Sequence, residues 1–436
     1  MKTVKKIKLI FVILIISFVV FQSSHAQSSQ TSARSRWFRE ARVGMIIHWG
    51  LYSIPAGIWN GKQIPYYGEW IKDRASISNA DYSKLATQFN PEKFNADEWI
   101  KMASDAGMKY FCFVTKHHDG FCLWDTKQNN DWNVMDATPF KRDIVKELGD
   151  ACRKQGMIYA LYYSTGLDWH YPSTNWKAYK PYYFGQLKEL LTNYGKIGYL
   201  WFDGEWTPQW NDSEAVELYN YVRALDPDII TNNPKKKSSS TYGDFGLDEE
   251  NYSPPDSALR SGLWERDRLV QFNTWGYKSW AKWKKSVDLI RDMIDAASLS
   301  MNFCINIGPM ADGSFPPEAK AILKDFGGWL KVNGEAIYNT TGNVKNMKIN
   351  CEGRITKSEL ANSIWYVHVF NWPTNDSSVT ITTYEPITNV TVLDPRISIK
   401  KPVIKRNDGV TTIMIYKPKT SNSIATVIKL QSKNSK

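Results

Sequence analysis

The chain of 436 residues carries a formal net charge of +11, and 23% of its residues are charged. This length is too great for one ordinary compact domain and suits a large α/β barrel followed by a smaller domain. The sequence has no histidine–cysteine spacing typical of a zinc site and no glycine-rich phosphate loop, so we expect no metal, no cofactor and no nucleic-acid partner.

The N-terminus has the plan of a secretory signal peptide over residues 1–26. Four lysines lie among the first eight residues, an apolar run extends from Leu9 to Phe21, and Ser24-His25-Ala26 offers a small-residue cleavage site. The apolar run is too short to span a bilayer comfortably, and no second long apolar run follows, so no membrane span is expected. We therefore expect a secreted or periplasmic protein of residues 27–436, with a net charge of about +7.

Apolar runs rich in β-branched and aromatic residues alternate with amphipathic segments over residues 27–340. The predicted strands are 43–47, 110–115, 157–163, 199–203, 228–231, 269–273 and 302–307. The predicted helices are 96–106, 143–155, 185–194, 213–225 and 287–298, with Asn95 and Ser213 as N-caps. Strands that alternate with helices indicate parallel βα units, and seven or eight units over about 300 residues favour a catalytic (β/α)8-like barrel. A doubly wound open sheet is the alternative.

The pattern of apolar and polar residues changes after residue 340. Residues 341–436 alternate apolar and polar positions, as in Ile364–Phe370 and Val379–Thr382, and turn residues such as Pro373 separate the runs. This pattern predicts a C-terminal antiparallel β-sandwich domain.

Five cysteines are scattered through the chain, at Cys112, Cys122, Cys152, Cys304 and Cys351. An odd number, placed within apolar stretches, favours buried thiols over a disulfide framework, although one bridge stays possible.

Polar residues gather where the predicted barrel strands end, which is where barrel enzymes carry their working residues. His48, His117 and Asp203 each follow an apolar strand, and Gly204 lets the chain turn away from the Asp203 carboxylate. A carboxylate in this position can attack an anomeric carbon in a retaining glycosidase, which needs a second acid about 5–5.5 Å away. The alternative role for Asp203 is a helix-capping residue at a βα turn.

The adjacent pair His117 and His118 raises the question of a metal ion. Neighbouring strand residues point to opposite faces, so both rings cannot easily ligate one ion without a bend in the chain. Hydrogen bonding to sugar hydroxyls is the favoured role, and an internal hydrogen bond of either ring is the structural alternative.

Several motifs together resemble glycoside hydrolase family 29, the α-L-fucosidases, from about Trp37 to Tyr338. They are His48-Trp49-Gly50, Tyr67-Gly68-Glu69-Trp70, Lys116-His117-His118-Asp119-Gly120-Phe121, Trp201-Phe202-Asp203-Gly204, Trp264-Glu265, Trp275-Gly276-Tyr277, Asn306-Ile307-Gly308-Pro309 and Asn333-Gly334-Glu335-Ala336-Ile337-Tyr338. Each motif alone is weak, but the combination is highly specific, and the trailing sandwich also suits the family.

The resemblance implies hydrolysis with retention and without a cofactor, on an oligosaccharide or polysaccharide. It places Asp203 as the nucleophile and His48, His117 and His118 as hydrogen-bond donors to the sugar. It further implies a pocket lined by Glu69, Trp70, Tyr163, Trp201 and Trp275, the last of these against the C6 methyl group of the sugar. Tyr162 could take the place of Tyr163, because the sequence does not fix the register of the strand.

The acid/base residue varies in position within this family, and three glutamates compete for the role. Glu249 aligns with the segment of the family that carries the acid, Glu250 follows it, and Glu265 stands in the Trp264-Glu265 motif. We expect Glu249 to be the acid/base, with Glu250 and then Glu265 as alternatives.

The sequence departs from the family where Asn-Asn-Arg is common, since it has Asn232-Asn233-Pro234 followed by Lys235–Lys237. Loss of that Arg alters one wall of the sugar pocket, so an α-L-galactosidase on algal glycans is an alternative to an exo-α-L-fucosidase. The lysines are either a solvated loop or a contact to a sulfated or acidic glycan. A non-catalytic sugar-binding protein on the same scaffold is a further alternative, and the sequence does not indicate the oligomeric state.

Overall fold

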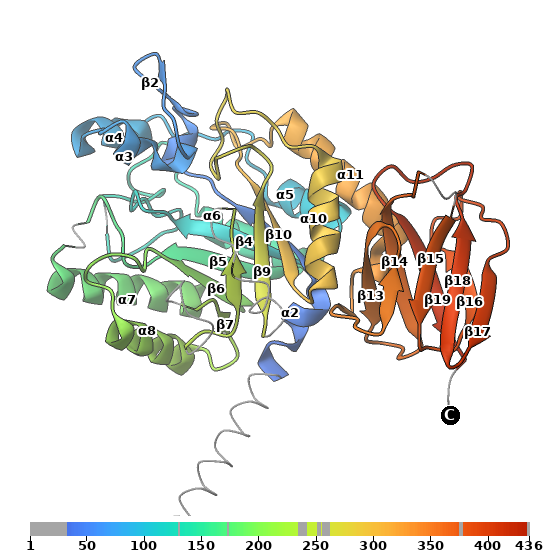
Figure 1. Cartoon of the computed structure of the whole chain (residues 1–436). Helices are drawn as coiled ribbons and strands as arrows, with labels where there is room; N and C mark the ends of the chain where they lie inside the picture. The colour runs from blue at the N-terminus through green and yellow to red at the C-terminus, as the bar shows by residue number, and fades with distance from the viewer. Residues whose placement is uncertain are drawn as a thin grey trace, which may run out of the picture.

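The computed structural model describes residues 33–129, 131–171, 174–233, 242–250, 254, 262–374 and 378–433. A barrel with its surrounding helices forms the N-terminal part, and a sandwich of strands packs beside it (Figure 1). The predicted signal peptide lies outside the described residues. Within the described ranges, no helix is long and apolar enough to cross a membrane.

Eight parallel strands form the barrel, in the order β7-β6-β5-β4-β1-β10-β9-β8. They are β1 (Val43–Ile47), β4 (Tyr110–Lys116), β5 (Ile158–Ser164), β6 (Tyr199–Asp203), β7 (Ile230–Thr231), β8 (Gly246–Asp248), β9 (Trp264–Leu269) and β10 (Asn302–Ile307). A single parallel bridge between Asn232 and Phe245 joins the two outer strands β7 and β8. The prediction of a barrel of parallel strands is therefore confirmed, and the open-sheet alternative is not.

Helices cover the outside of the sheet and connect its strands (Figure 1). They are α2 (Arg36–Ala41), α3 (Ile71–Arg74), α4 (Asn79–Ala86), α5 (Ala96–Asp105), α6 (Ile144–Gln155), α7 (Trp176–Asn193), α8 (Asp212–Leu225), α10 (Ser286–Ser298) and α11 (Pro317–Asn333). Short 3-10 turns are η1 (Leu51–Ser53), η2 (Gly68–Trp70) and η3 (Gly334–Ala336), and a small hairpin consists of β2 (Ile58–Trp59) and β3 (Lys62–Gln63).

Capping side chains fix where several helices begin. Asn95 caps α5 by accepting a hydrogen bond from the backbone of Glu98, as predicted. The predicted cap Ser213 is wrong, because Asn211 accepts from the backbone N–H groups of Ser213 and Glu214 and α8 begins one residue earlier. The amide side chain of Asn211 satisfies two helix donors at once, which leaves Ser213 inside the first turn.

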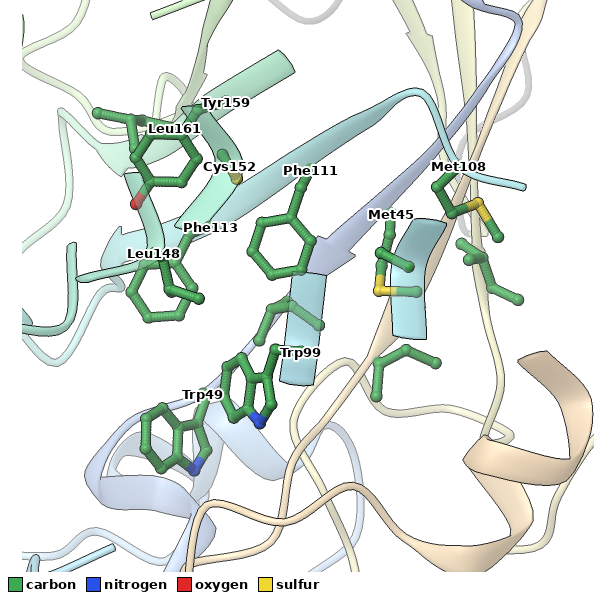
Figure 2. Packing of buried hydrophobic residues seen from close by; sticks show 14 of the residues in the cluster. Met45, Trp49, Trp99, Met108, Phe111, Phe113, Leu148, Cys152, Tyr159 and Leu161 are labelled. Carbon is green, nitrogen blue, oxygen red and sulfur yellow. The ribbon is translucent and has the colours of Figure 1, made fainter. Parts of the chain in front are cut away.

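The main hydrophobic core fills the space between the strands and the helices. Figure 2 shows part of it, with Met45 and Phe111 from the strands near Trp49 and Trp99. The Trp49 and Trp99 rings meet edge to face at 5.1 Å between centroids. A second, smaller cluster fills the inside of the barrel with residues such as Tyr110 and Cys304. The barrel is thus packed on both faces of its sheet, as parallel sheets are. All five cysteines are free thiols, so the possible bridge does not form.

The C-terminal part is an antiparallel sandwich of two sheets, as predicted, with strand orders β11-β13-β14-β19-β16 and β12-β15-β18-β17. Its strands are β11 (Thr340–Thr341), β12 (Met347–Ile349), β13 (Glu352–Ser358), β14 (Ile364–Asn371), β15 (Ser378–Thr383), β16 (Ile387–Val392), β17 (Val403–Asn407), β18 (Val410–Tyr416) and β19 (Thr426–Ser432). The sandwich packs on α10 and α11 (Figure 1). Arg291 of α10 donates to the backbone carbonyls of Phe370 and Ile424, and Phe370 belongs to the same apolar core as the barrel.

Candidate active site

A cavity of about 280 Å³ opens at the carboxyl ends of the barrel strands. Its walls carry carboxylates, imidazoles and aromatic rings, from His48, Tyr66, Tyr67, Glu69, Trp70, His117, His118, Trp201, Asp203, Trp206, Glu249 and Trp275. Nine of the twelve sequence-predicted site residues are among them, and Tyr163, Glu250 and Glu265 are not. The structure therefore gathers most of the predicted residues, although they are spread over some two hundred positions of the chain.

Asp203 is the last residue of β6 and is 7% exposed. Its Oδ2 accepts a hydrogen bond of 2.5 Å from the hydroxyl of Tyr162, and its Oδ1 accepts from the backbone N–H of Gly204 at 2.9 Å. Gly204 has φ of +87°, and a Cβ atom there would lie 2.8 Å from the backbone nitrogen of Leu167. The turn after β6 thus needs glycine, and it holds the carboxylate at the cavity wall.

The ring nitrogens of His118 are oriented by neighbouring groups. Nδ1 lies 2.7 Å from the Ser164 hydroxyl oxygen, and that hydroxyl donates to the carbonyl of Leu167, so His118 Nδ1–H is the donor. Nε2 then points toward Asp203, 3.7 Å from its Oδ2. Ser164, the last residue of β5, therefore sets the tautomer of His118, which follows β4.

His48 is held in a similar way by Asn306 of β10. The amide nitrogen of Asn306 donates to the carbonyl of Trp275, so its oxygen accepts from His48 Nδ1–H at 2.7 Å. In the neutral ring Nε2 is then an acceptor, and the predicted hydrogen bond from this ring to the sugar stays a prediction.

The expectation that His117 and His118 diverge is wrong. One ligand atom from each ring and one from Asp203 all lie within 4.8 Å of one another. The strand β4 ends at Lys116, so the alternation of an extended strand no longer separates the two rings.

Tyr163 does not line the cavity, and its neighbour Tyr162 is the tyrosine that contacts Asp203 behind the cavity wall. The Tyr163 hydroxyl donates to Gln186 of α7 at 2.6 Å, and the Lys116 ammonium lies 4.4 Å from its ring centroid. Tyr162 faces the other way, toward Asp203, and stacks on Trp201 at 4.9 Å. Of the two tyrosines that the sequence left open, Tyr162 is the one on the Asp203 side, because successive side chains of a strand point to opposite faces.

Glu69 lies at the cavity wall in η2 and is 1% exposed. Its Oε2 accepts from the backbone N–H groups of Gly276 at 2.7 Å and Trp275 at 3.2 Å, while Oε1 has no hydrogen-bond partner among the described residues. Burial raises the pKa of Glu69 to about 7, although these two hydrogen bonds and Lys278 act in the opposite direction. Glu69 thus changes charge near neutral pH.

The three candidates for the acid/base lie in different places. Glu249 follows β8 and lines the cavity. Glu250 forms an ion pair with Lys284 outside it. Glu265 is buried at the start of β9, where it accepts from the hydroxyls of Tyr110 at 2.5 Å and Tyr199 at 3.3 Å. Tyr110 and Tyr199 are the first residues of β4 and β6, so Glu265 lies at the opposite end of the barrel from the cavity.

Three lining residues were not among the predicted site residues. Tyr67 stands in the Tyr67-Gly68-Glu69-Trp70 motif, and Tyr66 and Trp206 each lie three positions from a predicted site residue, Glu69 and Asp203, so proximity in sequence was an available signal for all three. The φ of +74° and the 44% exposure of Tyr66 appear only in the structure. The residues 234–241, which include Lys235–Lys237, lie outside the described residues, so the predicted anion contact stays a prediction.

The pocket combines carboxylates, which can act as nucleophile and as acid/base, with imidazole and indole rings, which suit the binding of a sugar. It lies at the carboxyl end of the barrel strands, where barrel enzymes carry their active sites. Fold and site together define a glycoside hydrolase. The sequence model described as alpha-L-fucosidase matches residues 19–335. The chain belongs to this family, glycoside hydrolase family 29, whose members hydrolyse with retention.

Relatives of known activity agree with this assignment. The chain is 32% identical to the human plasma alpha-L-fucosidase over 367 residues, which cover 78% of this chain and 76% of that protein. It is 33% identical to the rat tissue alpha-L-fucosidase over 325 residues, covering 70% and 69% of the two chains.

Solved structures extend the likeness across both domains. An alpha-L-fucosidase from Bacteroides thetaiotaomicron, trapped as a covalent intermediate with 2-fluoro-fucosyl fluoride, superposes with a TM-score of 0.82 at 30% identity. The match covers 92% of this chain and 96% of that one. An alpha-L-fucosidase from Vibrio sp. strain EJY3 superposes with a TM-score of 0.84 at 28% identity, over 92% and 73% of the two chains.

Proposed function

We propose that this protein is an exo-acting enzyme that releases terminal α-L-fucose with retention, using Asp203 as nucleophile and Glu249 as acid/base. The observation that carries the proposal is that these two carboxylates line one cavity, while Glu250 and Glu265 lie outside it. A volume of about 280 Å³ lies just below the range of roughly 300–1,000 Å³ usual for drug-sized ligands, and so suits one sugar ring rather than a chain.

In the first step Asp203 Oδ attacks the anomeric carbon, and the bond to the leaving oxygen breaks as protonated Glu249 donates its proton to that oxygen. A covalent glycosyl-enzyme forms. In the second step a water molecule loses a proton to Glu249 and displaces Asp203, which returns both residues to their first states and gives the sugar with its original configuration.

The surrounding contacts support this assignment of roles. The Tyr162 hydroxyl and the Gly204 N–H orient the Asp203 carboxylate and stabilise its charge, including when it leaves in the second step. The Nδ1 atoms of His48 and His118 are held by Asn306 and Ser164, which fixes the orientation of both rings at the cavity wall, where sugar hydroxyls would meet them. Trp275 places its ring 5.0 Å from His48, as an apolar wall for the C6 group.

L-galactose is the second candidate sugar, because it differs from L-fucose by a hydroxyl at C6. The departure from the family after Asn233 motivates it, and the basic charge of the chain would suit a sulfated glycan. We also propose export after cleavage of residues 1–26; N-terminal sequencing that finds an uncleaved protein in the cytoplasm would overturn this.

The test is hydrolysis of aryl α-L-fucoside and aryl α-L-galactoside by the mature chain, with product configuration followed by NMR. We expect faster turnover of the fucoside, a first product of α configuration, and a loss of at least about a thousandfold in Asp203→Asn. Preference for the galactoside would support the second candidate. A first product of β configuration, or near-normal rates in Asp203→Asn, would overturn the double displacement, and turnover of neither sugar would indicate a binding protein.

A further inference from the structure

The inside of the barrel holds a second cluster of chemically active side chains, none of which lines the sugar cavity. Glu265 and Asp267 of β9 and Cys304 of β10 point into the barrel, and each is fully buried. One carboxylate oxygen from each acid and the Cys304 sulfur all lie within 4.8 Å of one another. Neither the proposed hydrolysis nor the family assignment uses these three residues as a group.

Strand pairing brings these residues together. β9 and β10 are parallel neighbours, and their register sets Cys304 directly beside Asp267. The alternation along β9 sends Arg266 and Arg268 outward to Asp248 and Asp292, and sends Glu265 and Asp267 inward. The two inward acids therefore have no arginine of their own strand beside them.

Asp267 is the unexplained member of the cluster. Both of its carboxylate oxygens are buried, and neither has a hydrogen-bond partner among the described residues. A buried carboxylate without partners costs several kcal/mol, so such a group is usually paired with a cation or coordinates a metal. A positive ion at this point would offset that cost.

We propose that Glu265, Asp267 and Cys304 bind a divalent transition-metal ion, with zinc as the favoured ion. A thiolate with two carboxylates suits zinc rather than magnesium or calcium, which prefer oxygen ligands alone. Ligand atoms of a tetrahedral zinc lie about 3.5 Å apart, which small side-chain rotations reach from separations within 4.8 Å. The ion has no part in hydrolysis; it ties β9 to β10.

The surroundings supply the supporting shell that such sites have. The hydroxyls of Tyr110 and Tyr199 donate to the Glu265 carboxylate and orient it. Cys112 of β4 belongs to the same interior cluster as Cys304, but its sulfur is not among the ligand atoms that all lie within 4.8 Å of one another. No short sequence motif marks this site, because Cys304 of β10 is 37 positions from Asp267 of β9 and only strand pairing brings them together.

The experiment is metal analysis of the untagged mature chain after expression with added zinc and desalting. We expect about one zinc per chain, and less than a tenth of that in Asp267→Ala and in Cys304→Ala. Asp203→Asn is the control for the His117, His118 and Asp203 group in the cavity, and Cys351→Ser controls for the half-buried thiol; both should keep their zinc.

Cobalt replacement tests the thiolate bond directly and does not depend on activity. Cobalt-loaded wild type should show a sulfur-to-cobalt charge-transfer band that Cys304→Ala loses, and Cys351→Ser should retain it. If Asp267→Ala fails to fold by circular dichroism, this comparison of wild type with Cys304→Ala decides the matter. Wild type without bound zinc, zinc retained in Cys304→Ala, or a cobalt complex without the band would overturn the proposal, and the two carboxyls would then be protonated or hydrated groups.

Discussion

Glu249 and Glu250 are neighbours in the sequence but lie in different surroundings. Glu249 faces the sugar cavity, whereas Glu250 is tied to Lys284. If Glu249 is the acid/base, its removal spares substrates with very good leaving groups, which depart without a proton, and slows the second step, which needs a base.

We therefore expect Glu249→Ala to hydrolyse an aryl fucoside with a good leaving group more slowly in steady state, and added azide to restore turnover through a glycosyl azide product. Glu250→Ala is the matched control and should show no rescue. Glu265→Ala should show none either, because Glu265 lies at the far end of the barrel. Rescue of Glu250→Ala or Glu265→Ala in place of Glu249→Ala would reassign the acid/base.

Glu69 makes the stability of the protein depend on pH. Its pKa is about 7 in the folded protein, against 4.5 for the free side chain. Between these values the folded state binds more protons than the unfolded state, so the free energy of unfolding falls as pH rises from about 4.5 to about 7. Below this window the group is neutral in both states, and above it the full penalty of the buried charge remains.

Glu69→Gln should remove this dependence while keeping an oxygen for the Gly276 N–H. We expect the variant to be more stable than wild type at pH 8, by at most about 3 kcal/mol, with a smaller difference at pH 4.5. Urea unfolding at both pH values measures this. Equal differences at the two pH values would show that the Glu69 carboxyl is not the group responsible.

At the scale of a strand, β5 shows what the sequence can and cannot predict. Its bounds were predicted to within one residue at each end, but its inward face was not. All but its first residue are buried, so no polar face marks which side chains point outward. The choice between Tyr162 and Tyr163 therefore needed the three-dimensional structure.

The two tyrosines offer a paired test. Tyr162→Phe removes the hydrogen bond to Asp203 and should lower kcat/KM by about ten- to a hundredfold, as expected for a bond to a charged group worth about 1.5–3 kcal/mol. Tyr163→Phe removes the bond to Gln186 and should cost about 1 kcal/mol of stability with kcat/KM nearly unchanged. Initial rates and urea unfolding of both variants measure the contrast. Equal losses of activity would contradict the assigned faces.

Strand β9 was missed for a different reason. Residues 269–273 were predicted as the strand, whereas the strand is Trp264–Leu269 and carries four charged residues in a row. A strand is predicted from its pattern of apolar residues. On the outer face of β9 the positions expected to be apolar hold Arg266 and Arg268, which form ion pairs with Asp248. The predicted bounds of strands β1, β6 and β10 match the structure, because these strands are mostly apolar and fully buried and their hydrophobic runs are not interrupted by charged side chains.

At the scale of the whole molecule, barrel and sandwich share one apolar core. Tyr366, Phe370 and Val427 of the sandwich belong to the core cluster that also fills the helix layer of the barrel. Arg291 adds hydrogen bonds to two sandwich carbonyls. The barrel without the sandwich would expose this apolar surface to water.

A chain truncated after residue 341 should therefore be aggregated or unfolded, as measured by size-exclusion chromatography and circular dichroism. Arg291→Ala in the full chain is the control. It should stay as monodisperse as wild type and lose about 1–3 kcal/mol of stability, the cost of two partly buried carbonyls left without a donor. A soluble truncated chain with wild-type turnover would show that the barrel folds independently.

The seam of the barrel has a consequence for how the enzyme moves. β6 pairs with β5 at four positions, from Leu200 to Asp203. β7 and β8 are only two and three residues long, and the described residues at their junction share one bridge, between Asn232 and Phe245, and three backbone hydrogen bonds. Segments with so few backbone bonds open at lower free energy than the rest of a fold. The two proposed catalytic carboxylates therefore differ in how rigidly they are held. Asp203 ends a fully paired strand, whereas Glu249 follows the short strand β8, where we expect local opening at lower free energy. Such opening on the leaving-group side would let a bulky glycan enter and its released part depart before water attacks.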